Sequence, residues 1–217
     1  MCILNYFSKL KSIIVICFVM FSVFTVDGQV TEHFSDETPG ATSFSNSGVT
    51  YNLTVGKFEI AYGSAYGYTG TTTDDYYVDN WSSILNAAGV VGAITKTTNN
   101  FYVYDFWIFP GDGSATKSNG GTIIIRGKLS GATQFTKTVE GADINLGVGY
   151  TYVDLISFST TEIDELEFEL TGNLRYLAVD DFRHQSFVAN ATPKATAPSA
   201  SSVMEDTTHI VLSEELP

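Results

Sequence analysis

The chain is poor in cysteine, in basic residues and in long apolar runs. Its two cysteines, Cys2 and Cys17, both lie near the beginning, so the rest of the chain cannot form disulfides or thiolate metal sites. Basic residues number 11 against 24 acidic ones, for a formal net charge of −13. This excludes the basic footprint that nucleic-acid binding requires. The run Ile13–Val26 is shorter than the roughly 20 apolar residues of a membrane-spanning helix.

The beginning of the chain has the pattern of a secretory signal. Lys9 and Lys11 precede the apolar run, and small residues follow it. We therefore expect residues 1–28 to be a signal peptide that is cleaved near Gly28–Gln29. The mature protein would be secreted or held at the cell surface, with no membrane insertion after cleavage. The alternative is an uncleaved membrane anchor.

Short β-prone runs fill residues 29–188, and turn residues such as Gly, Asn, Asp and Ser separate them. The pattern lacks the alternation of strands and helices that a parallel sheet needs. It predicts an all-β domain, a two-sheet antiparallel jelly-roll sandwich. It also predicts a short helix at Trp81–Gly92 and a tight hairpin at Thr171–Asn173. The predicted strands are Val49–Leu53, Lys57–Tyr62, Tyr76–Asp79, Phe101–Phe109, Thr122–Leu129, Gln134–Val139, Tyr152–Phe158, Leu166–Leu170 and Leu174–Arg183.

The end of the chain changes in composition. Residues 189–202 (ANATPKATAPSASS) are almost entirely small or polar, which is typical of a flexible linker. Residues 203–217 are expected to be the start of a further β repeat or a disordered tail. Within them, VMEDTTHIVL at Val203–Leu212 resembles the opening strand of cadherin-like or immunoglobulin-like repeats of large bacterial surface proteins. That resemblance implies other domains of a longer chain as partners.

Three segments carry a second resemblance: TEHFSD at Thr31–Asp36, YYVDN at Tyr76–Asn80 and YLAVDDFR at Tyr176–Arg183. Together they resemble the MAM-like and galactose-binding-like jelly-roll modules of secreted multidomain surface proteins, without the cysteines of MAM domains. The resemblance implies that the first and last strands are neighbours, tied by a structural Ca²⁺. Carried over by position, its ligands would be Glu32, Asp180 and Asp181.

Asp180 has a second reason to need a partner. It alternates with Leu174, Ala178 and Phe182, and an acid on an apolar face is costly unless it is bonded. Carboxylates and carbonyls are the ligands that Ca²⁺ prefers, which fits the metal hypothesis. The alternative is that Asp180 accepts backbone N–H groups or caps a turn.

The segment EIDELE at Glu162–Glu167 resembles the E-x-D-x-x-E motif of laminarinase-type glycoside hydrolases. The resemblance implies Glu162 as nucleophile, Asp164 as the orienting acid and Glu167 as general acid and base, in a retaining mechanism. Glu165 stands where that motif is normally apolar. The chain also has only two tryptophans to line a sugar cleft. We therefore favour the alternative, a charged solvent face on a strand.

Ligand-binding residues are expected in the Tyr- and Gly-rich stretch that begins at Ala61. Tyrosine and tryptophan rings suit sugars and protein partners alike. The alternative is that these rings pack over the sandwich edge. The favoured function is a non-catalytic extracellular binding or adhesion module for a glycan or an extracellular protein, with a glycoside hydrolase or a structural spacer as alternatives. The candidate ligand-binding residues are Tyr66, Tyr68, Asp74, Asp75, Tyr76 and Trp81.

Overall fold

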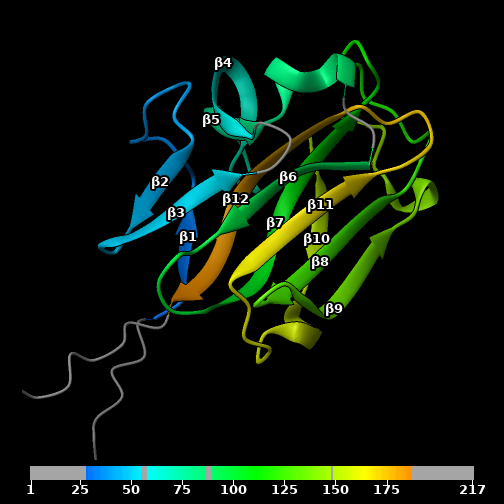
Figure 1. Ribbon diagram of the computed structural model, residues 1–217. Coiled ribbons are helices and arrows are strands. Elements are labelled where there is room, and N and C mark those ends of the chain that lie inside the picture. Colours follow the sequence, from blue (N-terminus) through cyan, green and yellow to red (C-terminus); the bar gives the residue numbers. More distant parts are fainter. Residues whose placement is uncertain (1–27, 55–57, 87–88, 148, 187–217) are drawn as a thin grey trace, which may run out of the picture.

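A computed structural model describes residues 28–54, 58–86, 89–147 and 149–186. Two six-stranded antiparallel sheets pack face to face as a β-sandwich (Figure 1), and the strand order is consistent with a jelly roll. The predicted all-β sandwich is therefore confirmed. The expected signal peptide up to residue 27, the linker and the tail lie outside the described residues.

The first sheet has the strand order β10-β7-β12-β5-β4, and β1 also pairs with β12. The second sheet has the order β2-β3-β6-β11-β8-β9. The first sheet consists of β1 (Val30–Glu32), β4 (Glu59–Tyr68), β5 (Thr73–Asp79), β7 (Phe101–Gly111), β10 (Thr151–Asp154) and β12 (Tyr176–Ser186). The second consists of β2 (Ser43–Asn46), β3 (Val49–Thr54), β6 (Gly89–Thr95), β8 (Ile123–Leu129), β9 (Ala132–Val139) and β11 (Glu165–Leu170).

The core lies between the sheets and follows the alternation of the strands. In β11, Leu166, Phe168 and Leu170 are buried in it, as their spacing predicts. Glu167 and Glu169 point to the opposite face, where they pair with Arg126 and Lys128 of β8. The second sheet thus carries charge on its outer face and apolar residues on its inner face.

The last strand, β12, has two neighbours along one edge. β5 pairs with it at Ala178–Val179, and β1 pairs with it at Phe182–His184. The expected pairing of the first and last strands is therefore present. Asp181, with a φ of +51°, forms a bulge between the two pairings, where the register with β7 also shifts.

The bulge corrects the predicted faces of the last strand. Phe182 was expected on the same face as Asp180, but it lies in the core with Leu177 and Val179, because a single extra residue reverses the side of every residue that follows it. Leu174 was expected on that face too; it lies in the core as part of the turn before β12. Tyr176, Ala178 and Asp180 share the outer face as predicted.

Three local predictions were wrong. The strand predicted at Tyr152–Phe158 ends at Asp154, and Ile156–Phe158 is a 3-10 helix. The helix expected at Trp81–Gly92 is a 3-10 helix at Trp81–Asn86 (η1), and the residues after it form strand β6 from Gly89. The turn at Thr171–Asn173 does not close a hairpin, because it connects β11 and β12, which belong to different sheets. The remaining 3-10 helices are η2 (Gly141–Asp143) and η3 (Ile156–Phe158).

Candidate functional site

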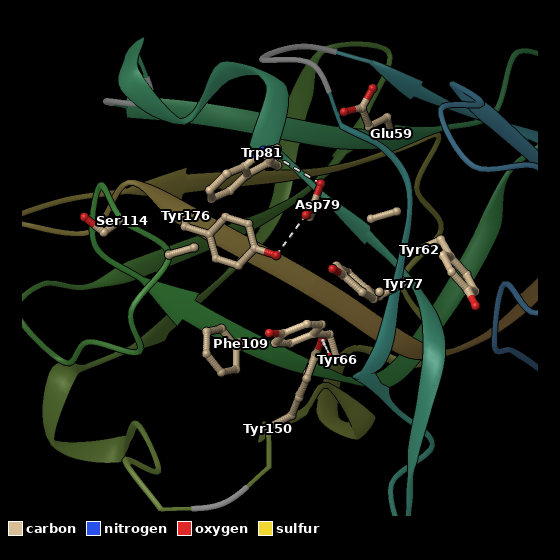
Figure 2. Close-up of a pocket in the computed structure, with 13 residues that line it drawn as sticks. Glu59, Tyr62, Tyr66, Tyr77, Asp79, Trp81, Phe109, Ser114, Tyr150 and Tyr176 are labelled. Carbon is tan, nitrogen blue, oxygen red and sulfur yellow. Dashed lines mark hydrogen bonds between the residues drawn. The ribbon is translucent and has the colours of Figure 1, made fainter.

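A cleft of about 570 Å³ opens on the outer face of the first sheet (Figure 2). Strands β4, β5, β7 and β12 form its floor, and η1 and the β7–β8 loop contribute to its wall. Its volume is within the range of roughly 300–1,000 Å³ that small-ligand sites occupy. The lining residues are Glu59, Ala61, Tyr62, Gly63, Tyr66, Tyr77, Asp79, Trp81, Phe109, Ser114, Ala115, Tyr150 and Tyr176.

The floor of the cleft is aromatic and tightly packed. Tyr77, Tyr150, Tyr176 and Ala178 form a buried cluster separate from the main core. Phe109 joins Tyr176 and Tyr150, with ring centroids 6.2 and 5.7 Å away. Tyr77, Phe109 and Tyr176 come from β5, β7 and β12, which are neighbours in the sheet, and Tyr150 joins them from the loop before β10. The strand pairing therefore fixes the spacing of the first three rings.

Ring contacts continue beyond the cleft along the sheet. Tyr150 stacks on Tyr68 with centroids 5.7 Å apart. Tyr68 contacts Trp107, and Trp107 contacts Tyr152, each at 5.0 Å. An aromatic row therefore crosses the outer face of the sheet from the cleft to β10.

The rim of the cleft exposes three large rings. Tyr62, Tyr66 and Trp81 have exposed fractions of 56%, 70% and 55%. Single exposed aromatics are ordinary on a protein surface, but a group around a concave site is a frequent mark of binding. The rim can therefore offer ring faces to a ligand that the buried floor cannot.

The position of Tyr66 depends on an irregular segment of β4. Ala65 has a φ of +61°, and the β4–β5 register breaks between Tyr62 and Gly67. Asp75 Oδ1 accepts a hydrogen bond from Ala65 N–H at 2.8 Å, and Tyr150 O–H donates to the Tyr66 carbonyl at 2.8 Å. These two bonds hold the backbone that projects Tyr66 into solvent.

Asp79 is the buried acid of the cleft. Its Oδ2 accepts a hydrogen bond from the Tyr176 phenol at 2.8 Å, and its Oδ1 accepts one from Trp81 N–H at 3.1 Å. Burial, with a smaller contribution from the nearby Glu59, raises the pKa of Asp79 to about 6. Burial and the neighbouring Asp79 also raise the pKa of the Tyr176 phenol, so it remains a hydrogen-bond donor.

The predicted ligand-binding residues divide into two groups. Tyr66 and Trp81 line the cleft. The other four lie elsewhere in the sheet: Tyr68 is in the aromatic row, Tyr76 packs against the main core, Asp75 supports the β4 bulge and Asp74 lies near Asp180. Sequence reasoning missed most of the lining, including Tyr150 and Tyr176, because it comes from segments far apart in the chain.

Asp180 lies next to the β4–β5 hairpin and is fully buried. Its Oδ2 accepts a hydrogen bond from Tyr68 N–H at 2.6 Å, and its Oδ1 accepts one from Asp181 N–H at 2.7 Å. Burial, reinforced by the nearby Asp74 carboxylate, raises the pKa of Asp180 to about 9. A Cβ at position 67 would collide with Asp74 Oδ1 and approach Asp180 Oδ2, so only Gly67 fits between the two acids.

The proposed calcium ligands have separate partners. Glu32 accepts hydrogen bonds from Phe34 N–H at 2.7 Å and from the Asn46 amide at 2.8 Å. Asp181 lies 2.9 Å from His33 Nδ1. Within the described ranges, no group of three or more His, Cys, Asp or Glu side chains has an arrangement that could hold a metal ion. The calcium hypothesis therefore stays a prediction that rests on the resemblance.

The three acids of the EIDELE segment also have separate partners. Glu162 accepts a hydrogen bond from the Asn100 amide, and Asp164 accepts one from Ser130 N–H, each at 2.9 Å. Glu167 forms ion pairs with Arg126 and Lys128. Glu167 is thus part of the charged outer face of the second sheet, on a different sheet from the aromatic cleft.

No protein-family model matches this chain, and no curated protein matches it significantly. In the part of the chain that the structure describes, no helix is long and apolar enough to cross a bilayer.

Proposed function

We propose that this domain is a non-catalytic extracellular module that binds a glycan, and that the aromatic cleft on the first sheet is its binding site. The observation that carries the proposal is the combination of three exposed rim rings with a buried aromatic floor. Sugar rings have apolar faces that stack on such rings and hydroxyls that bond to phenols and carboxylates.

The polar groups of the cleft support the same proposal. Asp79 and Glu59 offer carboxylate oxygens, and Tyr62 and Tyr66 can each donate or accept a hydrogen bond at the rim. A few polar groups in a mainly aromatic cleft are typical of sites that bind small polar ligands. The expected signal peptide predicts that the protein is exported, and export would bring the cleft into contact with extracellular glycans.

The test is a glycan array followed by isothermal titration calorimetry with any ligand found. Tyr66→Ala and Trp81→Ala should each weaken binding by about tenfold or more, or about 1.4 kcal/mol, since tyrosine and tryptophan are enriched among the residues that carry most of the binding energy. Both side chains are exposed, so the melting temperature should change little.

Tyr152→Ala is the matched control. Tyr152 is also an exposed tyrosine on the first sheet, at 47%, but it does not line the cleft. It should leave affinity unchanged. Equal losses for Tyr152→Ala and Tyr66→Ala would contradict the cleft as the site. An array without any bound glycan would favour the adhesion or spacer alternatives.

A further inference from the structure

Two acidic residues occupy directly opposite positions on neighbouring strands of the cleft. Glu59 on β4 and Asp79 on β5 are cross-strand partners, and both line the cleft (Figure 2). Like charges at directly opposite positions of an antiparallel pair destabilise the sheet. The fold therefore places together two negative groups that do not stabilise each other.

One of these acids, Asp79, accepts hydrogen bonds from the protein, but these bonds do not balance its negative charge. The two hydrogen-bond donors to Asp79 are the Tyr176 phenol and a backbone N–H, and both are uncharged. Among the described residues that line the cleft, none is a lysine, arginine or histidine. The negative charge of this end of the cleft thus remains available to a ligand.

The surrounding rings favour the same kind of ligand. The face of a Trp, Tyr or Phe ring attracts a cation within about 6 Å of its centroid. Phe109, a ring of the cleft, already makes such a contact, because Lys117 Nζ lies 5.1 Å from its centroid. Lys117 does not line the cleft, and its ammonium donates to the carbonyls of Gly147 and Gly149.

We propose that the glycan bound here carries a protonated amine, as in a chain of deacetylated amino sugars. The ammonium would lie between the Glu59 and Asp79 carboxylates and the rings of Trp81 and Tyr176. Neutral sugar units would contact the rim rings. Glycans with uronate or sulfate groups would be repelled. This inference rests on the proposed glycan-binding function and specifies the ligand of the same site.

The experiment compares three oligosaccharides of equal length by calorimetry: oligomers of glucosamine, of N-acetylglucosamine and of galacturonic acid. Glucosamine oligomers should bind at least about tenfold more tightly than the acetylated ones, and galacturonic acid oligomers should not bind. Equal or tighter binding of the acetylated oligomer would overturn the amine preference but leave glycan binding intact. Failure of every glycan on a broad array would overturn both.

A pair of variants separates the cleft from the general charge of the protein. Glu59→Gln removes a partly exposed charge from the cleft, and Asp143→Asn removes an exposed charge from η2, which is outside it. The ratio of the two affinities, glucosamine over N-acetylglucosamine, should fall toward one in Glu59→Gln and stay at its original value in Asp143→Asn. A similar fall in both variants would mean non-specific attraction to an acidic protein, and would overturn the proposal.

Discussion

The carboxylate of Asp180, at the bulge of the last strand, lies 2.6 Å from the backbone nitrogen of Tyr68 at the end of β4. This bond connects the strand that closes the sandwich to the hairpin that carries the rim of the cleft. The groups that surround Asp180 are Asp74 of β5, the adjacent Asp181, the phenols of Tyr77 and Tyr150, and two backbone N–H groups. Only the N–H groups favour an ionised Asp180.

Asp180 should make stability depend on pH. Its pKa rises from 3.8 to about 9 on folding, so the folded state favours the protonated acid. Its contribution is complete below about pH 4 and is lost as pH rises toward about 9. We expect the free energy of unfolding in urea to fall between about pH 6 and pH 9, and Asp180→Asn to reduce this slope. Asp143→Asn, at an exposed site, should keep it; an unchanged slope in Asp180→Asn would contradict the prediction.

Asp79 should make ligand binding depend on pH on the acid side. Its pKa of about 6 means that it is largely ionised at neutral pH and loses its charge as pH falls below about 6. The groups around it are Glu59, Tyr176 and Tyr77. The amine of a glucosamine unit titrates in a similar range, so the test uses a glucosamine oligomer whose amines are trimethylated and keep their positive charge at every pH. Calorimetry with this oligomer should show weaker binding at pH 5 than at pH 7, and constant affinity would contradict the role of Asp79.

Glu167 should be needed for stability. Its side chain is only 10% exposed and pairs with Arg126 and Lys128, whereas Glu162 is exposed and bonded to Asn100. Glu167→Gln should lower the free energy of unfolding by about 1–3 kcal/mol, and Glu162→Gln by less than about 0.5 kcal/mol. Reducing-end assays on β-glucans should detect no hydrolysis by the unmodified protein. Hydrolysis that both substitutions abolish would instead support the glycoside hydrolase alternative.

Calcium should stabilise the domain if the ion implied for Glu32, Asp180 and Asp181 is bound. A ligand at a hundredfold excess over its Kd adds about 2.7 kcal/mol to the free energy of unfolding. Thermal unfolding with CaCl₂ and with EDTA measures this directly, and Asp181→Asn should reduce the difference. Equal melting temperatures in both solutions would contradict a structural calcium ion.

The sequence predicted those parts of the fold that depend on short-range alternation. Leu166, Phe168 and Leu170 lie in the core because their spacing matches a strand. The strand Gly89–Thr95 was not predicted, because its first four residues, Gly89–Gly92, lie within the segment from Trp81 that the sequence predicts to be a helix. The bulge at Asp181 was also missed, because a positive φ at a non-glycine residue has no clear signal in sequence.

The cleft was only partly predictable for a different reason. Tyr66 and Trp81 stood out because they belong to one aromatic stretch. Tyr150 and Tyr176 reach the same site only through the pairing of β12 with β5 and β7, together with the loop before β10. Pairings between such distant segments cannot be derived from local patterns. The alternation of Tyr176 and Ala178 with buried Leu177 and Val179 was the available signal for an aromatic outer face.

The pairing of β1 with β12 has a mechanical consequence. Val30 lies opposite His184, so the chain enters β1 and leaves β12 at the same corner of the sandwich (Figure 1). Tension applied through both flanking segments would pull the two antiparallel strands apart from that corner. The hydrogen bonds between them would then break one after another rather than share the load. Tension from both sides would thus separate β1 from β12 at low force and expose the edge of β12 beyond the Asp181 bulge. The pairing of β12 with β5, which supports the cleft, would be loaded only after that separation.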